Sequence, residues 1–135
     1  MTKQEQVTQL RADTEVHYNC CQSVLIPFCG ECGIDRDTAF RLGKNFNNGM
    51  KMGSVCGALV GALMVLGMTG ADGDKATRLR EEFKTRHNAV DCTALLQKAR
   101  EAGIPRKLHC DGMVFEAVEL LEELLGEESK KNPGT

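Results

Sequence analysis

The sequence predicts an all-α fold, a single-domain helical bundle of about five to six helices. Strand signals are nearly absent, because no stretch alternates apolar and polar residues and β-branched residues are scattered. The chain has no Trp, so Leu, Val, Ala and Met must fill the core, which favours helices. Its 135 residues suit one compact domain. We expect this domain over residues 1–128 and a disordered tail over residues 129–135.

The first helix is expected from about Gln4 to Leu25. Residues at three- and four-residue steps would share its inner face. They are Val7, Leu10, Thr14, His17, Cys21 and Leu25. Pro27 removes a backbone donor and disfavours helix at Ile26, so the helix should break there. Gly30 and Gly33 then close the region as caps.

Two helices are expected in the middle of the chain. Asp35 is placed to cap a short helix over about residues 36–46, and the stretch NNGMKMG is typical of a loop. Ser54 is placed to cap a central helix from Val55 to Met68. This apolar stretch has 14 residues, and a membrane-spanning helix needs about 18 or more. We therefore expect a buried helix and no membrane partner.

Glycines recur every four residues around this central helix, at Gly53, Gly57 and Gly61. A stripe without side chains lets another backbone or a bulky group come close. Ordinary tight helix packing would explain the stripe. Contact with a cofactor at Gly57 and Gly61 is the functional interpretation, and the two interpretations are compatible.

Three helices are expected in the second half, over about residues 75–87, 92–102 and 112–126. Asp91 is placed to cap the second of these, and Gly103 with Pro105 would end it. The last helix has an apolar stripe and an acidic face, which indicates a solvated surface. The acidic residues are Glu116, Glu119, Glu122 and Glu123.

The composition of the chain limits the classes of binding partner and the cellular compartment that we expect for it. Lys and Arg number 17 against 19 Asp and Glu, so the net charge of −2 offers no broad basic surface for nucleic acid. The polar N-terminus lacks a signal-peptide core, and we expect a cytoplasmic protein. Seven cysteines in such a protein argue for metal binding or redox chemistry, and their odd number argues against a fully paired disulfide framework.

Four cysteines stand far apart in the chain, at Cys20, Cys56, Cys92 and Cys110. The last three lie where a helix is expected to begin. The positive end of a helix dipole lowers the pKa of a thiol, and the thiolate is both the nucleophile and the metal ligand. Cysteine is also a small apolar residue that is often buried and inert, so packing is the alternative interpretation.

Histidines accompany two of these cysteines. His17 would share a helix face with Cys20 or Cys21, which lie about 100° apart on a helix. It is a candidate ligand or base, or an ordinary helix residue. His109 precedes Cys110, and its cation could lower the pKa of that thiol. An exposed loop histidine is the alternative.

Cys29 and Cys32 form the single Cys-x-x-Cys of the chain. This spacing suits a metal chelate or a reversible disulfide. The pair follows a helix and has no second Cys-x-x-Cys to complete a zinc ribbon. An accessory redox pair and simple packing at a loop remain open.

The segments YNCCQSVL, RLGKNFNNGM and GSVCGALVGALMVLG, followed by lone cysteines at 92 and 110, resemble the redox-active protein family named for its C_GCAxxG_C_C pattern. The similarity extends from about residue 16 to residue 125. It assigns Cys20 and Cys56 to the first two cysteines of the pattern and Cys92 and Cys110 to the last two. Gly57, Ala58 and Gly61 fit the residues that follow the second cysteine.

The resemblance implies an all-helical fold and a redox role. Some relatives look like parts of multi-haem or iron–sulfur proteins, but this chain has no Cys-x-x-Cys-His for covalent haem. The pattern gives no role to Cys21, which replaces a small residue. It also gives none to Cys29 and Cys32, which with Pro27 replace an unbroken helix end.

Three hypotheses follow. In the first, Cys20, Cys56, Cys92 and Cys110 bind an iron–sulfur cluster or other metal ion for electron transfer with a redox partner protein. In the second, no metal is bound, and the chain is a thiol–disulfide oxidoreductase in which Cys56 attacks and Cys20 is a second catalytic thiol. In the third, the chain is a non-enzymatic helical interaction module. A homodimer is compatible with each.

Overall fold

The computed structural model describes the backbone of residues 1–131 and the side chains of residues 1–127. Within that range the fold is all-α, as expected, and the only β pairing is an isolated bridge between Val55 and Asp91. The elements are α1 (Lys3–Ala12), α2 (Cys20–Leu25), the 3-10 helix η1 (Ile26–Phe28), α3 (Arg36–Gly43), the irregular turn η2 (Gly49–Gly53), α4 (Gly57–Met68), α5 (Gly73–His87), α6 (Cys92–Glu101) and α7 (Arg106–Lys131).

The expected count of five to six helices is wrong, because the described residues form seven α-helices and one 3-10 helix. The expected first helix is two helices separated by an extended segment. Asp13 is extended, and its Oδ1 accepts hydrogen bonds from the amides of Glu15 (2.8 Å) and Val16 (2.9 Å). Such local bonds compete with the helix. Asn19 then starts α2 with a capping box to Gln22.

The boundary of the last helix also differs. α7 begins at Arg106, directly after Pro105, because proline is well tolerated at a helix start. Cys110 consequently lies one turn inside α7 and does not begin it, whereas Cys20 does begin a helix. The expected tail falls mainly on residues 132–135, which lie outside the described residues, and α7 includes residues 129–131.

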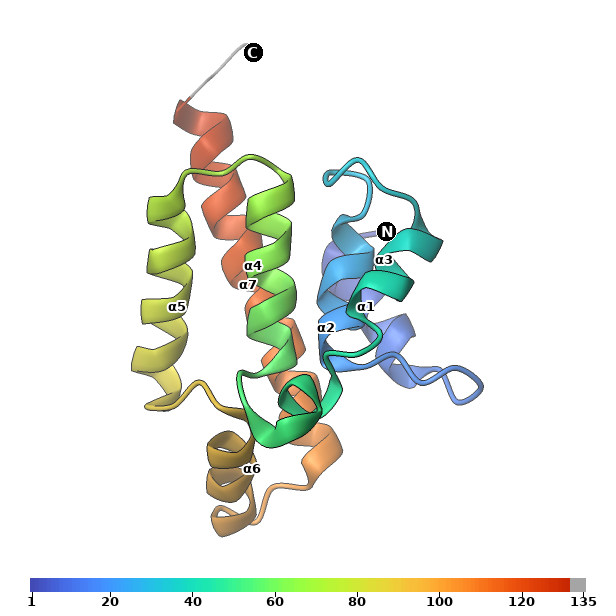
Figure 1. The fold of residues 1–135 in the computed structure, drawn as a ribbon, viewed down its shortest axis with the longest axis vertical. Coiled ribbons are helices and arrows are strands. Elements are labelled where there is room, and N and C mark those ends of the chain that lie inside the picture. The colour runs from blue at the N-terminus through green and yellow to red at the C-terminus, as the bar shows by residue number, and fades with distance from the viewer. Residues whose placement is uncertain (132–135) are drawn as a thin grey trace.

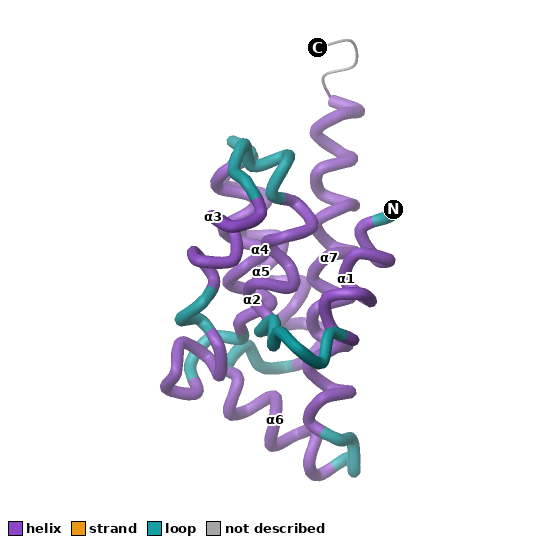
Figure 2. Tube along the Cα trace, turned by 90° about the vertical axis from the view of Figure 1, so that its right-hand side faces the viewer, coloured by secondary structure: helices purple, strands orange, loops and turns teal. Residues whose placement is uncertain are grey.

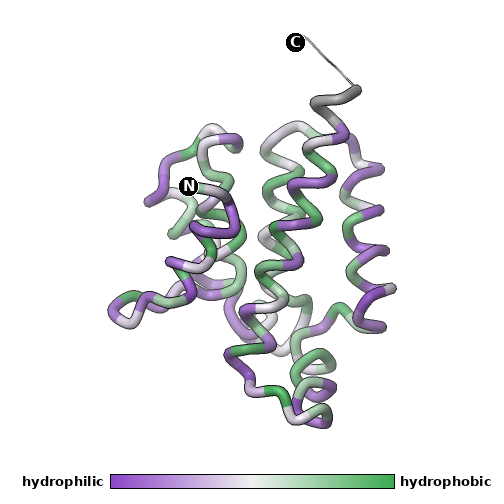
Figure 3. Tube along the Cα trace, turned by 180° about the vertical axis from the view of Figure 1, so that it is seen from behind, coloured by the Kyte–Doolittle hydropathy of each residue, from purple (hydrophilic) through white to green (hydrophobic). Residues whose placement is uncertain are grey.

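Helices α4 and α7 form the centre of the molecule (Figures 1 and 2). α5 packs on one side of them, α1, α2 and α3 on the other, and α6 lies across the end at which α4 begins. α4 is apolar all round because it is enclosed, with Ala58, Leu59, Ala62 and Val65 buried. The outer helix α5 is mostly hydrophilic (Figure 3).

The close contact between α2 and α4 depends on glycine. A Cβ on Gly57 would lie 2.9 Å from the Phe46 carbonyl oxygen, and a Cβ on Gly61 would lie 2.8 Å from the Cys21 carbonyl oxygen. Both distances are too short for a real side chain. Gly53 does not extend this stripe, because it lies in η2 with a φ of +71°.

Charged pairs join α5 to α7. Arg78 donates two hydrogen bonds to Glu127, at 2.6 and 2.9 Å. Glu116, which was expected on a solvated face, instead accepts from Arg86 at 2.9 Å and contacts His87 at 2.5 Å, and its side chain is only 17% exposed. That expectation was wrong because the face of α7 at Glu116 turns toward α5. No helix in the described part of the chain is long and apolar enough to cross a membrane.

Candidate functional site

Cys20, Cys56, Cys92 and Cys110 all line one cavity of about 460 Å³. The cavity lies at the end of the molecule where α2 and α4 begin and where α6 crosses (Figure 1). The four residues come from four separate segments of the chain, so the fold brings together the cysteines that the sequence pattern singled out. Three of the four, all except Cys110, lie at the beginning of a helix.

Cys20 is positioned by the cap of α2. The Asn19 side chain accepts from the Gln22 amide at 2.8 Å, and the Gln22 side chain accepts from the Asn19 amide at 2.9 Å. The Asn19 Nδ2 also donates to the Gly43 carbonyl at 2.9 Å. These buried bonds fix the start of α2 against the end of α3, and they hold the first residue of the helix, Cys20, at the cavity wall.

Cys56 and Cys92 are positioned by backbone pairing. The Cys56 amide donates to the Val90 carbonyl at 2.8 Å, and the Cys92 amide donates to the Ser54 carbonyl at 2.6 Å. These two hydrogen bonds flank the bridge between residues 55 and 91. They tie the start of α4 to the start of α6, so the two cysteines reach the same cavity.

A strained turn covers Cys92. Asn48, Met50 and Lys51 have φ values of 51°, 58° and 64°, a left-handed conformation that costs free energy in residues other than glycine. A Cβ on Gly49 would lie 2.8 Å from the Cys92 Cβ. The Cys92 Sγ lies 3.9 Å from the Asn48 Oδ1. This turn therefore lies directly against one of the cavity thiols.

Cys110 and Cys20 form a thiol pair. A hydrogen bond with Cys20 lowers the pKa of Cys110 to about 6 against the effect of burial, with help from the positive charges of Arg106 and Arg11. The same hydrogen bond, burial and the Cys110 charge raise the pKa of Cys20 well above its usual range. The pair therefore favours the state in which Cys110 is ionised and Cys20 keeps its proton.

The other two cavity thiols do not have the low pKa expected at a helix start. Burial raises the pKa of Cys56 to about 11, although the amides of Leu59 and Ala58 favour its thiolate. Burial and the charge of Cys110 raise the pKa of Cys92. The expectation was wrong for these two residues because the loss of water outweighs the helix dipole.

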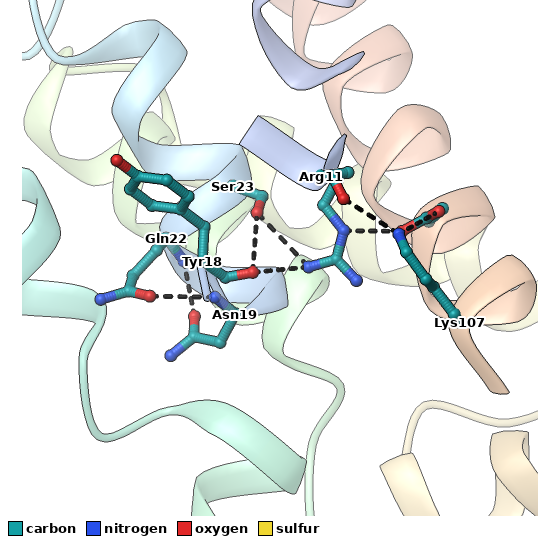
Figure 4. A network of polar contacts seen from close by, with 7 residues as sticks. Arg11, Tyr18, Asn19, Gln22, Ser23 and Lys107 are labelled. Atoms are coloured by element: carbon teal, nitrogen blue, oxygen red, sulfur yellow. Dashed lines mark hydrogen bonds and ion pairs between the residues drawn. The ribbon is translucent and has the colours of Figure 1, made fainter. Parts of the chain in front are cut away.

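Arg11 is held beside the thiol pair by the network shown in Figure 4. Its Nε donates to Asp111 Oδ1 at 2.7 Å and its Nη1 donates to the Tyr18 carbonyl at 2.7 Å. Lys107 donates to Asp111 Oδ2 at 3.0 Å. The Arg11 side chain is only 9% exposed, so its charge is fixed near Cys20.

Sequence reasoning missed Arg11 and Arg106 as the cations of the site. Arg106 lies one turn before Cys110 on α7, and a predicted helix start directly after Pro105 would have revealed this spacing. His109 lines the cavity, but burial and the charge of His87 lower its pKa. Burial therefore disfavours the histidine cation that was one of the two interpretations, and His109 is also not an exposed loop residue, because it lies half-buried in α7. His17 lines the cavity mouth and is exposed.

The remaining candidates lie partly or wholly outside the cavity. Cys21 is fully buried with its Sγ 4.0 Å from the Met64 Sδ, and burial raises its pKa to about 12. Gly57 lines the cavity, whereas Gly61 packs against Cys21 and Val24. The pair of Cys29 and Cys32 follows the opposite end of α2.

A family model described as "Putative redox-active protein (C_GCAxxG_C_C)" matches residues 18–124. This range includes all four cavity cysteines and the turn that covers Cys92. No curated protein and no solved structure matches the chain.

Proposed function

The chain belongs to the C_GCAxxG_C_C family, and from this premise we propose that its cavity holds an iron–sulfur cluster or another thiol-bound metal used for electron transfer. One observation supports the proposal most: Cys20, Cys56, Cys92 and Cys110 reach a single cavity from four segments. The proposed electron partner is another redox protein. The proposed setting is a reducing compartment such as the cytoplasm, where free thiols persist.

The donor chemistry of the cavity fits such a group. Four sulfur donors are the ligand set of iron–sulfur clusters and of many zinc sites. The described residues contain no three His, Cys, Asp or Glu side chains already gathered at one metal-binding point. The four thiols line a cavity of about 460 Å³, which leaves room for a cluster of several atoms. When bound, the cluster would accept and release single electrons.

The chain itself supplies orientation and charge. The cap of α2 positions Cys20, and the bridge between Val55 and Asp91 positions Cys56 and Cys92. Four thiolates in one cavity repel each other, and Arg11 and Arg106 offset part of that repulsion. Cys56 must lose its proton to become a ligand, so metal uptake should increase with pH.

Metal analysis tests the proposal. We expect protein purified without oxygen to contain iron and sulfide, or zinc, and Cys56→Ser to lose most of it. Cys32→Ser is the matched control, because this half-buried thiol lies outside the cavity lining. A folded, metal-free wild type would contradict the proposal, as would a Cys56→Ser variant with unchanged metal content.

A metal-free thiol–disulfide reaction is the second candidate, and the lowered pKa of Cys110 favours it. The Cys110 thiolate would attack a partner disulfide, break its S–S bond and release one partner thiolate. Cys20 would then lose its proton to solvent and attack the Cys110 sulfur, releasing the second partner thiol. The partner disulfide gains two electrons, and a dithiol reductant must restore the Cys20–Cys110 pair.

This candidate replaces Cys56 with Cys110 as the proposed attacking thiol, because Cys56 is 5% exposed and has a raised pKa. Trapping of a mixed disulfide shows whether Cys56 or Cys110 is the attacking thiol. Metal-free Cys20→Ser protein treated with a small aromatic disulfide should retain a mixed disulfide at Cys110. A mixed disulfide retained at Cys56 would make Cys56 the attacking thiol. If Cys110 reacted no faster than a model thiol, the thiol–disulfide candidate would be eliminated.

A further inference from the structure

Cys29 and Cys32 lie on one helical turn that follows η1, at the end of α2 opposite the cavity. In Figure 1 this turn lies at the top of the molecule, while the cavity end lies below. The Cys29 amide donates to the Ile26 carbonyl at 3.1 Å, and the Cys32 amide donates to the Phe28 carbonyl at 3.0 Å. Side chains three residues apart on such a turn share a face, about 5–6 Å apart at Cβ.

Both residues are half-buried at the edge of the core, so neither thiol is sealed from solvent. Burial, the charge of Glu31 and the charge of Cys29 raise the pKa of Cys32. A disulfide needs a Cβ–Cβ distance of about 3.5–4.5 Å, so a small closing movement would join them. Gly30 and Gly33 lie within and beside this pair, and glycine has the backbone freedom that such a movement needs.

A salt bridge holds this turn against α1. The Lys3 Nζ lies 2.6 Å from a Glu31 oxygen and donates to the Pro27 carbonyl at 2.8 Å. Its ammonium also lies 4.8 Å from the centre of the Phe28 ring. The turn is therefore anchored on both sides of Cys29, while the space beside its glycines is open to an incoming molecule.

We propose that Cys29 and Cys32 form a second redox site, a dithiol that exchanges with small disulfides to give a Cys29–Cys32 disulfide. This site is independent of the four-cysteine cavity and of any metal bound there. The family pattern contains neither residue, so the site would be a feature of this chain's own sequence.

The exchange takes two steps. The Cys29 thiolate attacks a small disulfide, whose S–S bond breaks and releases one thiolate. Cys32 then loses its proton to solvent and attacks the Cys29 sulfur, which releases the second small thiol. The protein loses two electrons and the small disulfide gains them. Cys29 is the first nucleophile because burial and the Glu31 charge raise the pKa of Cys32 to about 11.

Glutathione redox buffers provide the test. The protein, as purified without oxygen, is equilibrated at several ratios of oxidised to reduced glutathione. Its free thiols are then blocked, and it is cut with a glutamate-specific protease. Glu31 lies between the two cysteines. A Cys29–Cys32 disulfide therefore keeps the two peptides joined until a reductant separates them, and we expect the joined fraction to rise with the oxidised ratio.

Two variants assign the site. Cys32→Ser should instead carry glutathione at Cys29, and Cys29→Ser should lose the joined peptides, with its fold checked by circular dichroism. Metal content should stay at the wild-type level in both, which separates this site from the cavity. If the blocking reagent modified Cys29 and Cys32 completely at every glutathione ratio, no disulfide would have formed and the proposal would be overturned. Disulfide-joined peptides that persist in Cys29→Ser would also overturn it.

Discussion

At the residue scale, Cys56 and Cys110 show how strongly burial controls a thiol. Cys56 lies at a helix start, where the dipole favours a thiolate, yet its pKa is raised to about 11. Cys110 lies inside a helix, yet its pKa is lowered to about 6 because Cys20, Arg106 and Arg11 stabilise its thiolate. Direct partners therefore matter more than position relative to the helix dipole, which acts only over the first turn.

Alkylation of the reduced, metal-free protein should reveal this difference. We expect Cys110 to react first, with a rate that reaches half its plateau near pH 6. Arg106→Met should move that midpoint upward, because the thiolate loses a positive neighbour. Arg41→Met is the matched control, since Arg41 is exposed on α3 and lies outside the cavity lining. A midpoint near 8.5, the value of a free cysteine, would contradict the assigned contacts.

At the element scale, the position of the cavity depends on how closely α4 approaches α2. Gly57 leaves no room for a side chain between α4 and the backbone at Phe46 and Cys21. The same residue lines the cavity beside Cys56. Separation of these two helices would therefore move Cys20 away from Cys56, so helix packing and the geometry of the site are linked.

Gly57→Ala should destabilise the protein by about 1–3 kcal/mol, the usual cost of overpacking. The added Cβ would lie 2.9 Å from the Phe46 carbonyl oxygen. Gly67→Ala is the matched control on the same helix, with no atom within 4 Å of its Cβ. It should be neutral or stabilise by up to about 1 kcal/mol, because alanine favours helix. Equal urea midpoints for the two variants would show that α2 and α4 are not tightly packed.

At the scale of the whole molecule, the sequence predicts local features better than distant contacts. The starts of α3 and α6 were predicted correctly: Asp35 caps α3 by accepting from the Thr38 amide, and Asp91 occupies the N-cap position of α6 without a side-chain hydrogen bond. The break between α1 and α2 was missed because the apolar period continues through it, while the Asp13 and Asn19 side chains end and restart the helix.

The meeting of the four cysteines depends on contacts that no local pattern encodes. The Cys56 amide bonds the carbonyl of Val90, 34 positions later, and this pairing has no strand signal. The sequence singled out the four cysteines by their dispersed positions and by the family resemblance, but it did not show the contacts that bring them together. The raised pKa of Cys56 could not be predicted from the sequence either, because it depends on burial, which is known only once the helices are packed.

The cysteines also make the stability of the reduced, metal-free protein depend on pH. Between about pH 6 and the free-thiol pKa near 8.5, native Cys110 has lost a proton that the unfolded chain retains. The free energy of unfolding should therefore rise with pH, by at most about 1.4 kcal/mol per pH unit for one proton. Above that range Cys20, Cys21 and Cys56 keep protons that the unfolded chain loses, so stability should fall.

Urea unfolding between pH 5 and 10, in the presence of a reductant and a chelator, measures this profile. Cys110→Ser should remove the rise toward pH 8.5 and keep the fall above it, because the other thiols still have raised pKa values. Cys32→Ser should keep the rise, since that thiol lies outside the cavity lining. A rise that persists in Cys110→Ser would place its origin in another group. A rise confined to pH values below about 6.5 would instead indicate His109, because its lowered pKa keeps the native imidazole neutral where the unfolded one binds a proton.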